Sequence, residues 1–419
     1  MSILIDRVRV HNFRSLRDVE VSLRPVTLLV GMNNTGKTSF LRALHLALGG
    51  DRRIVAPEDV CMASNGGDES GEILIDCRIV PVDSNWTRLE EFGDTWLTTA
   101  FAGDLIRLDE DGKQFVAFRT KFTYDRLRND FECKRLLLND WLERDQWTKS
   151  EVEGKASVPR WEEILSFFID AQRDLVGDLR SRHSYVGRLL SNLEITSKDA
   201  REIEDQLATL NENIVSRSEV MTHLRKNLES LSQTVPSATG AVEITPVSKK
   251  VRDITKGVDV NFHDSDDSGF PLNYHGMGTR SWASLLTYKA YVSWLEKRAA
   301  HHQPPRPFHP ILALEEPEAH LHPNAQRQLY QQLVSATGQK IVSTHSPFVA
   351  TQGDLSSIRH FSKDGSETTV SELDVSHEDP EDKRKLEREV LNTRGELLFA
   401  RAIILFGRRT LEVFFCKNW

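Results

Sequence analysis

Apolar and polar residues alternate at the start of the chain. Residues 3–10 and 17–23 follow this period of two, which predicts two β-strands with one buried face each. Residues 26–30 are a short apolar run, Val-Thr-Leu-Leu-Val, which predicts a fully buried strand. Residues 39–48 have helical spacing and end at two glycines. A strand, a glycine-rich turn and a helix are therefore expected in direct succession.

The second half of the chain repeats the alternation of short strands and helices. Residues 311–314 and 340–343 are apolar runs that predict buried strands. Residues 276–299 and 325–336 have the spacing of helices. Strands and helices that alternate in this way predict an α/β fold with a sheet.

The region between these two halves predicts an insert. We expect a strand at residues 71–80, further strands with long connections over residues 84–160, and helix over residues 161–194. From residue 203 to 231, nine positions spaced alternately by four and three residues hold eight apolar side chains, the pattern of a heptad seam. The seam predicts a helical arm that pairs with another helix or subunit, or an amphipathic helix that lies on its own domain. Residues 232–240 then end the helix.

Composition limits the class of protein. With 39% hydrophobic and 28% charged residues, the 419-residue chain has an ordinary soluble composition and is long enough for two or three packed units. No run approaches the roughly 20 apolar residues of a membrane span, and the N-terminus does not resemble a signal peptide, so we expect a cytoplasmic protein. The net charge of −8 argues against a surface that is basic throughout.

The four cysteines show no metal-binding or redox spacing. We expect them to be unpaired thiols in a reducing compartment. They are Cys61, Cys77, Cys133 and Cys416.

Residues 31–38 read GMNNTGKT, which fits the phosphate-binding pattern G-x-x-x-x-G-K-[ST]. The glycines let backbone N–H groups converge on phosphate oxygens, and the following helix adds the positive end of its dipole. Lys37 can reach the outer phosphates and the Thr38 hydroxyl can ligate Mg²⁺. The sequence therefore predicts a site for ATP and Mg²⁺. Its candidate residues are Gly31, Asn33, Asn34, Thr35, Gly36, Lys37, Thr38 and Ser39.

A pair of acids follows the predicted strand at residues 311–314. In open α/β sheets ligands bind at the carboxyl ends of the strands, where Glu315 and Glu316 emerge. We expect Glu315 to hold Mg²⁺ through water and Glu316 to activate the water that attacks ATP. His345 follows the next strand and is expected to bond the γ-phosphate or that water.

A second glycine-rich helix start lies upstream of the acids. Gly276, Gly278 and Ser281 open the predicted helix, and the backbone N–H groups of such a start can receive an anion. A plain helix cap is the alternative explanation.

Together these motifs resemble the ABC-type ATPases, in the branch that includes SMC-like proteins. That resemblance implies that Gly276, Gly278 and Ser281 form a signature that contacts the nucleotide of an opposite subunit, so that two ATP molecules lie between two copies. Residues 12–14 (Asn-Phe-Arg), 168–174 (FIDAQRD) and 314–323 (LEEPEAHLHP) are more specifically similar to the OLD (overcoming lysogenization defect) family of ATP-dependent nucleases, associated with bacterial phage defence. In this resemblance Gln172 corresponds to the Q-loop glutamine, and the helical insert forms dimer contacts.

The C-terminal end departs from the OLD pattern. In that family a Toprim nuclease domain opens with a strand that ends in Glu-Gly, whereas here residues 407–409 are Gly-Arg-Arg. We expect an incomplete, degenerate Toprim start, and therefore ATP hydrolysis without DNA cutting by these 419 residues.

The expected domains are an ATPase N-terminal part at residues 1–130, a helical and coiled-coil insert for dimerisation at 131–240, an ATPase C-terminal part at 241–375, and a linker with the Toprim start at 376–419. The expected function is ATP hydrolysis that drives dimer closure and gates DNA processing, in phage defence or DNA repair. The alternatives are a nucleotide-switched scaffold that recruits a separate nuclease or toxin effector, and an SMC-like repair ATPase.

Overall fold

A computed structural model describes most of the chain and divides it into two compact units. The described residues are 2–49, 55–61, 71–101, 103–125, 127–143, 146–149, 158–171, 195–232, 245–247, 261–263, 269–271, 275–373, 379–393, 395–399, 402–406 and 411–415. The first unit consists of Met1–Arg173 and Val292–Trp419, and the second unit is Asp174–Tyr291.

The first unit contains an antiparallel sheet of six strands in the order β2-β1-β4-β6-β5, with β7 also paired to β6. Its strands are β1 (Ser2–Phe13), β2 (Leu16–Ser22), β4 (Ile73–Val82), β5 (Arg107–Leu108), β6 (Gln114–Asp125) and β7 (Asp130–Leu137). The alternating N-terminal pattern thus forms the predicted strand pair, with Val8 of β1 opposite Val21 of β2.

A second sheet of six strands carries the two motif-bearing strands, in the order β14-β13-β3-β12-β11-β8. Its strands are β3 (Val26–Gly31), β8 (Ile164–Ile169), β11 (His309–Glu315), β12 (Gln339–Ser343), β13 (Ile358–Asp364) and β14 (Glu367–Glu372). All neighbours are parallel except β13 and β14. Because β3, β12 and β11 are parallel neighbours, their carboxyl ends meet at one edge of the sheet.

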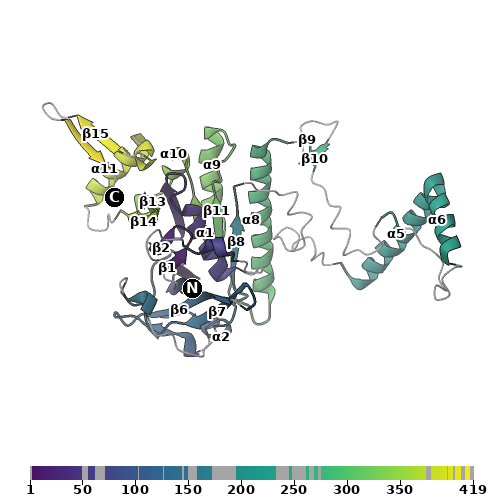
Figure 1. The fold of residues 1–419 in the computed structure, drawn as a ribbon, viewed down its shortest axis with the longest axis horizontal. Helices are drawn as coiled ribbons and strands as arrows, with labels where there is room; N and C mark the ends of the chain where they lie inside the picture. Colours follow the sequence, from purple (N-terminus) through teal and green to yellow (C-terminus); the bar gives the residue numbers. More distant parts are fainter. Residues whose placement is uncertain are drawn as a thin grey trace. The chain divides into compact units, whose positions relative to one another are not determined.

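Helix α1 (Lys37–Leu48) contacts strands of both sheets and shares their apolar core. Figure 1 shows it next to β8 and β11. Phe40 and Leu44 on α1 are fully buried, and burying each such side chain contributes about 1.5–3 kcal/mol. The position of the 31–38 loop is therefore fixed by a helix whose apolar side chains anchor it in the core.

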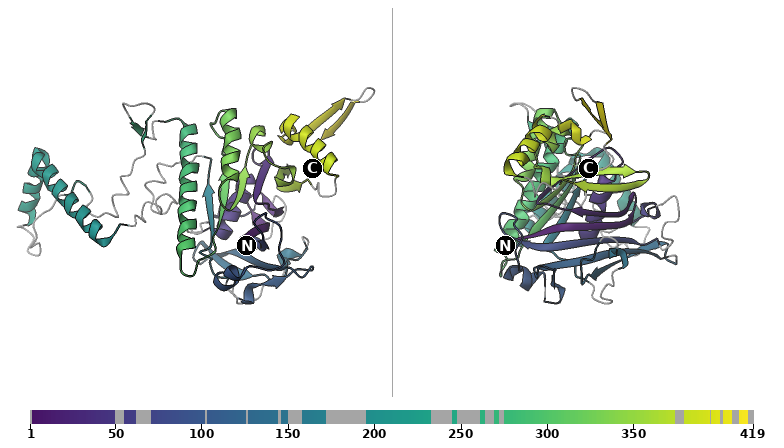
Figure 2. Two further views of the ribbon diagram at one scale, coloured as in Figure 1. Left: turned by 180° about the vertical axis from the view of Figure 1, so that it is seen from behind. Right: turned by 90° about the vertical axis from the view of Figure 1, so that its left-hand side faces the viewer.

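Further elements of the first unit surround the sheets. Helix α9 (Pro323–Val334) follows β11, and α10 (Pro347–Ala350) follows β12; the two helices contact each other. Figure 2 shows the blue strands β6 and β7 set apart from the green β11 and α9. The other elements are α2 (Asp94–Thr99), α11 (Pro380–Glu387), the π-helical Arg388–Thr393, the antiparallel strands β15 (Ala402–Phe406) and β16 (Leu411–Phe415), and short 3-10 turns.

The second unit contains two helices where the sequence predicted one. Helix α5 (Ser197–Arg217) ends at Ser218, and α6 (Glu219–Ser232) begins directly after it. Ser218 has an extended backbone, and its carbonyl accepts a hydrogen bond from Thr222 N, as expected of a serine that caps a new helix. The helices contact each other, and Arg225 pairs with Glu212 at 3.0 Å. The prediction of one continuous heptad helix is therefore wrong, and a coiled coil between subunits stays a prediction.

The remaining elements of the second unit are the short strands β9 (Asn261–His263) and β10 (Gly269–Pro271), which pair with each other, and the start of α8 (Met277–His301). Helix α8 continues into the first unit, which begins again at Val292.

The helix predicted for residues 161–194 is also wrong at its start. Ile164–Ile169 is strand β8, which pairs in parallel with β11. Its run Ile-Leu-Ser-Phe-Phe-Ile is rich in β-branched and aromatic residues, which suit a strand packed on both faces. Strand β7 pairs with β6, and β8 pairs with β11, both within the first unit. Residues 131–173, which the sequence placed in the insert, therefore belong to the first unit. Residues 172–194 lie outside the described residues.

Cys61, Cys77 and Cys133 form no disulfide within the described residues, and Cys416 lies outside them. In the described part of the chain every helix is too short or too polar to traverse a lipid bilayer.

Candidate functional site

The loop after β3 can be built only with glycine at two positions. Gly31 has φ +138°, and a Cβ there would lie 2.1 Å from the carbonyl oxygen of Phe361 on β13. Gly36 has φ +99°, and its Cβ would lie 2.5 Å from Thr368 Oγ1. Both conformations belong to the region that L side chains rarely adopt. The two motif glycines thus allow the loop to lie directly against β13 and β14.

Lys37 folds back over this loop. Its Nζ donates hydrogen bonds to the carbonyl oxygens of Gly31 (2.9 Å) and Met32 (2.7 Å), and the side chain is only 5% exposed. Burial lowers the pKa of Lys37 to about 8, although the nearby carboxylates of Glu316, Glu318 and Glu315 oppose this shift. Helix α1 has no acidic residue in its first turn, so its N-terminal amides remain favourable for an anion.

Glu315 and Thr38 are brought together although they are far apart in the sequence. Glu315 ends β11, and its Oε1 accepts a hydrogen bond from the Thr38 hydroxyl at the start of α1. A hydroxyl and a carboxylate supply the hard oxygen ligands that Mg²⁺ prefers. The residues predicted to hold Mg²⁺ therefore fit that ion chemically.

Glu316 faces His345. The backbone of Glu316 has φ +40°, an unusual value for a residue with a long side chain, and its N–H donates to Ser343 O at 3.0 Å. His345 Nε2 lies 3.2 Å from Glu316 Oε1. Burial, with a further contribution from Lys37, lowers the pKa of His345 to about 4, so the imidazole is neutral at pH 7. When the proton of the neutral imidazole is on Nε2, this distance is short enough for His345 to donate a hydrogen bond to Glu316.

Glu318, to which the sequence had given no role, is the most buried of the three acids. Its Oε1 accepts three hydrogen bonds, all from residues 344–346 that follow β12. The only signal in the sequence was its place in Glu-Glu-Pro-Glu, because the partners lie 26–28 residues further along the chain.

Thr368 and Ser15, to which the sequence analysis gave no role, are linked by hydrogen bonds to the backbone of the 31–38 loop. Thr368 Oγ1 on β14 donates to the carbonyl oxygen of Thr35 at 3.0 Å and lies 2.9 Å from Ser15 Oγ. Ser15 belongs to the turn between β1 and β2. No local pattern signals this contact, since Thr35 and Thr368 are separated by 333 positions.

A family model for the AAA ATPase domain matches residues 4–350, which is most of the chain. The chain belongs to the AAA ATPase domain family. The match includes the 31–38 loop, the acids after β11 and His345, and together with the mixed sheets and helices it confirms the predicted α/β ATPase class.

Two curated relatives of this AAA ATPase are OLD nucleases, which confirms the predicted resemblance. The "OLD nuclease" of Thermus scotoductus is 26% identical over 440 aligned positions, covering 98% of this chain and 71% of that protein. The "Old nuclease" of Escherichia phage P2 is 25% identical over 366 positions, covering 83% of this chain and 57% of that protein. The chain thus spans only part of each relative.

Solved structures with partial similarity to this AAA ATPase include SMC heads. One is an SmcHead bound to the C-winged helix domain of ScpA (TM-score 0.43, 14% identity, covering 89% of this chain and 98% of that one). Another is the SMC head domain from Thermotoga maritima (TM-score 0.38, 12% identity, covering 90% and 100%). Scores below 0.5 do not establish a shared fold.

The remaining predicted residues of the AAA ATPase are placed as follows. Asn33 and Asn34 are exposed at the tip of the loop, and Ser39 is half-buried in the first turn of α1. Gly276 is exposed just before α8, Gly278 lies in its first turn, and the Ser281 side chain is buried. These three belong to the second unit, so their roles stay predictions, and Gln172 lies outside the described residues.

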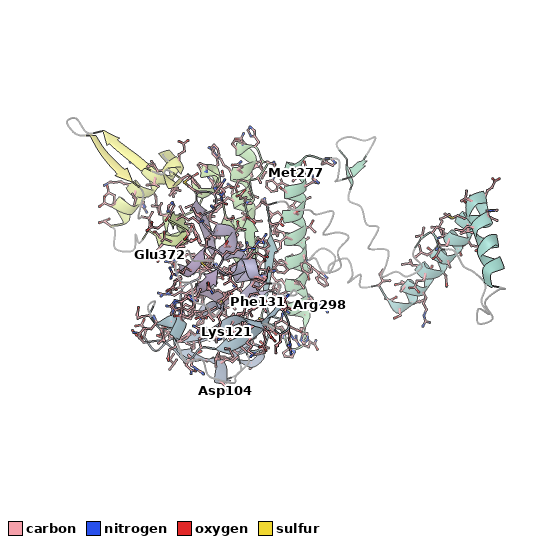
Figure 3. All side chains as sticks on the ribbon, viewed as in Figure 1. Asp104, Lys121, Phe131, Met277, Arg298 and Glu372 are labelled. Atoms are coloured by element: carbon pink, nitrogen blue, oxygen red, sulfur yellow. The ribbon has the colours of Figure 1, made fainter. Side chains whose placement is uncertain are left out.

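A cavity of about 680 Å³ lies away from this site, at the opposite end of β3. Most of its charged side chains are paired with each other: Arg78 with Asp6, Arg88 with Asp109, and Arg359 with Glu372. Glu372, which Figure 3 labels, ends β14. Arg359 is 2% exposed and also donates to the carbonyl oxygens of Ser22, Ser356 and Ile358. The Arg78–Asp6 pair lies within the first sheet and the Arg359–Glu372 pair within the second, while Arg359 also reaches the end of β2 through its hydrogen bond to the carbonyl oxygen of Ser22.

Proposed function

We propose that this chain binds ATP with Mg²⁺ and hydrolyses it, and that ATP-driven pairing of two copies controls DNA processing. The observation that carries the hydrolysis proposal is the grouping of Lys37, Glu315, Glu316 and His345 at one edge of the second sheet. These groups supply a cation for phosphate, oxygen ligands for Mg²⁺ and a carboxylate base.

Each residue has a distinct role in the proposed reaction. Lys37 and the amides of residues 31–38 bind the phosphates, and Thr38 with Glu315 holds Mg²⁺, which offsets phosphate charge when bound. Glu316 orients the attacking water and accepts its proton. His345, neutral at pH 7, donates a hydrogen bond to Glu316 before ATP arrives and to the γ-phosphate or the water afterwards.

Dimer closure rests on the resemblance to the ABC-type ATPases, and the link to DNA rests on the two relatives named as nucleases. Gly276, Gly278 and Ser281 would contact the nucleotide of the other copy. Duplex DNA is the expected partner. Its affinity should rise when ATP is bound, and a fluorescence anisotropy titration with and without ATP measures that change.

Glu316→Gln tests the central claim, because Gln keeps the size of the side chain but cannot accept the proton. We expect kcat for ATP to fall by about 1,000-fold while ATP affinity changes less than threefold. The trapped ATP state should double the mass seen by light scattering, only when ATP is present. Wild-type turnover in Glu316→Gln would show that the base is another residue.

Glu110→Gln is the matched control. It removes one exposed carboxylate of the same unit and should leave both turnover and mass unchanged. If Glu316→Gln loses turnover but stays monomeric with ATP, hydrolysis stands and the proposed closure is wrong.

A further inference from the structure

Glu318 is an acid whose burial needs an explanation. It is only 7% exposed, whereas its neighbours Glu315 and Glu316 are partly exposed. Removing a carboxylate from water costs free energy unless hydrogen bonds replace the lost water. Burial also raises the pKa of Glu318, against the hydrogen bonds that lower it. The identity of its donors indicates what the carboxylate is for.

One oxygen of Glu318 collects three donors from consecutive residues. Oε1 accepts from Thr344 Oγ1 at 2.7 Å, from His345 N at 2.6 Å and from Ser346 N at 3.1 Å. Two successive backbone amides directed at one anion form a nest, which fixes the conformation of the peptide between them. That peptide carries the His345 side chain.

The segment on either side of His345 is held by other contacts. Thr344 N donates to Leu29 O on β3 at 3.0 Å, which ties the segment to the strand before the phosphate loop. Ser346 caps α10 by accepting from Phe348 N at 3.1 Å, and its hydroxyl donates to Gln326 Oε1 on α9 at 2.5 Å. Among these contacts, only those to Glu318 reach the amide of His345 itself.

The second carboxylate oxygen of Glu318 makes no hydrogen bond within the described part of the chain that would stabilise the fold. Oε2 is buried and has no hydrogen-bond partner among the described residues. A buried polar atom left without a partner costs free energy, so this acid is poorly explained as a stabilising contact alone.

We propose that Glu318 is a positioning residue that orients His345 toward Glu316 and the γ-phosphate end of the nucleotide. This inference rests on the proposed ATPase function. Glu318 acts through the 344–346 segment, because its accepting oxygen is occupied by that segment. Its loss should therefore slow turnover without weakening the grip of Lys37 on the phosphates.

Two substitutions at Glu318 distinguish the effect of its hydrogen-bond acceptor from the effects of its charge and its volume. Glu318→Gln keeps an Oε1 acceptor for all three donors, whereas Glu318→Met keeps a similar size and has no comparable acceptor. We expect Glu318→Met to lower kcat by about 30-fold with KM and ADP affinity changed less than threefold, and Glu318→Gln to retain at least a third of wild-type kcat.

A double-mutant cycle with His345→Ala distinguishes positioning from a purely structural role, because it measures whether the effect of Glu318→Met on kcat depends on His345. If Glu318 acts through His345, Glu318→Met in the His345→Ala background should lower kcat no further than about twofold. A 30-fold loss in both backgrounds, equal losses for Gln and Met, or an unchanged kcat in Glu318→Met would each overturn the proposal.

Controls keep the two proposals distinguishable. Lys37→Ala and Glu316→Gln are measured in the same assay: if neither changes turnover, the proposed function fails, whatever Glu318 does. If Lys37→Ala and Glu316→Gln do lower turnover but the effects of Glu318→Met and His345→Ala on kcat are additive, only the positioning role of Glu318 fails. Should Glu318→Met not fold by circular dichroism, Thr344→Val replaces it. This variant removes one donor at nearly constant volume, and its kcat should fall about threefold in the presence of His345 and not in its absence.

Discussion

Charged side chains are arranged differently around the cavity at one end of β3 and around the 31–38 loop at its other end. At the cavity end, Arg78, Arg88 and Arg359 are each paired with a carboxylate, of Asp6, Asp109 and Glu372 respectively. At the loop end, one ammonium group, Lys37, lies near the carboxylates of three glutamates. The first arrangement is satisfied within the fold. The second holds an excess of negative charge, which favours binding of a metal ion, and a lysine positioned for phosphate.

The largest effect that separates the two ends is expected at Lys37. Lys37→Ala removes a charge-assisted contact to phosphate, so the Kd for ATP should rise about 100-fold in a fluorescent-nucleotide titration. Lys113→Ala removes a lysine that lines the cavity at the opposite end and should leave the Kd unchanged. Equal Kd values for the two variants would erase the proposed distinction.

The opposite result is expected at Arg359. Arg359→Met removes hydrogen bonds to several carbonyl oxygens, so the free energy of unfolding in urea should fall by about 2 kcal/mol, while ATP affinity stays the same. Arg17→Met is the control, because Arg17 pairs with Glu367 at the surface, with 47% of its side chain exposed. That variant should leave the free energy of unfolding close to the wild-type value, because an exposed ion pair contributes little. A weaker ATP affinity in Arg359→Met would mean that the two ends are coupled.

The smallest expected effect is a dependence of ATP affinity on pH that arises from Lys37. Burial places the pKa of Lys37 at about 8 in the protein without nucleotide, and bound phosphates would raise it. Binding therefore takes up a proton above pH 8, and ATP affinity should fall about tenfold between pH 7 and pH 9. Calorimetry across this range measures the slope, and Lys37→Ala should remove it. A slope that persists in Lys37→Ala would have to come from another group.

Local patterns were enough to predict the strand, turn and helix that surround Lys37. The apolar run at residues 26–30 and the helical spacing of residues 39–48 correspond to β3 and α1. The motif also indicated which acids would face the loop, because parallel strands end at a common edge.

Elements fixed by distant partners were not predictable in this way. The apolar run of β8 is equally compatible with a helix until β11 pairs with it, and the heptad spacing continues across Ser218 although the helix does not. Likewise, no period in the sequence signals that Glu318 accepts from residues 344–346, or that Thr368 supports Thr35. These contacts depend on how strands far apart in the chain come together.

Gly31 and Lys37 should also differ in their evolutionary fate. Any side chain at Gly31 would push β13 away from β3, so folding alone requires this glycine. A buried lysine has no such protection once phosphate is no longer bound. A descendant that had lost its nucleotide would be free to replace Lys37 while still retaining Gly31. The lysine is therefore the better marker of an active lineage.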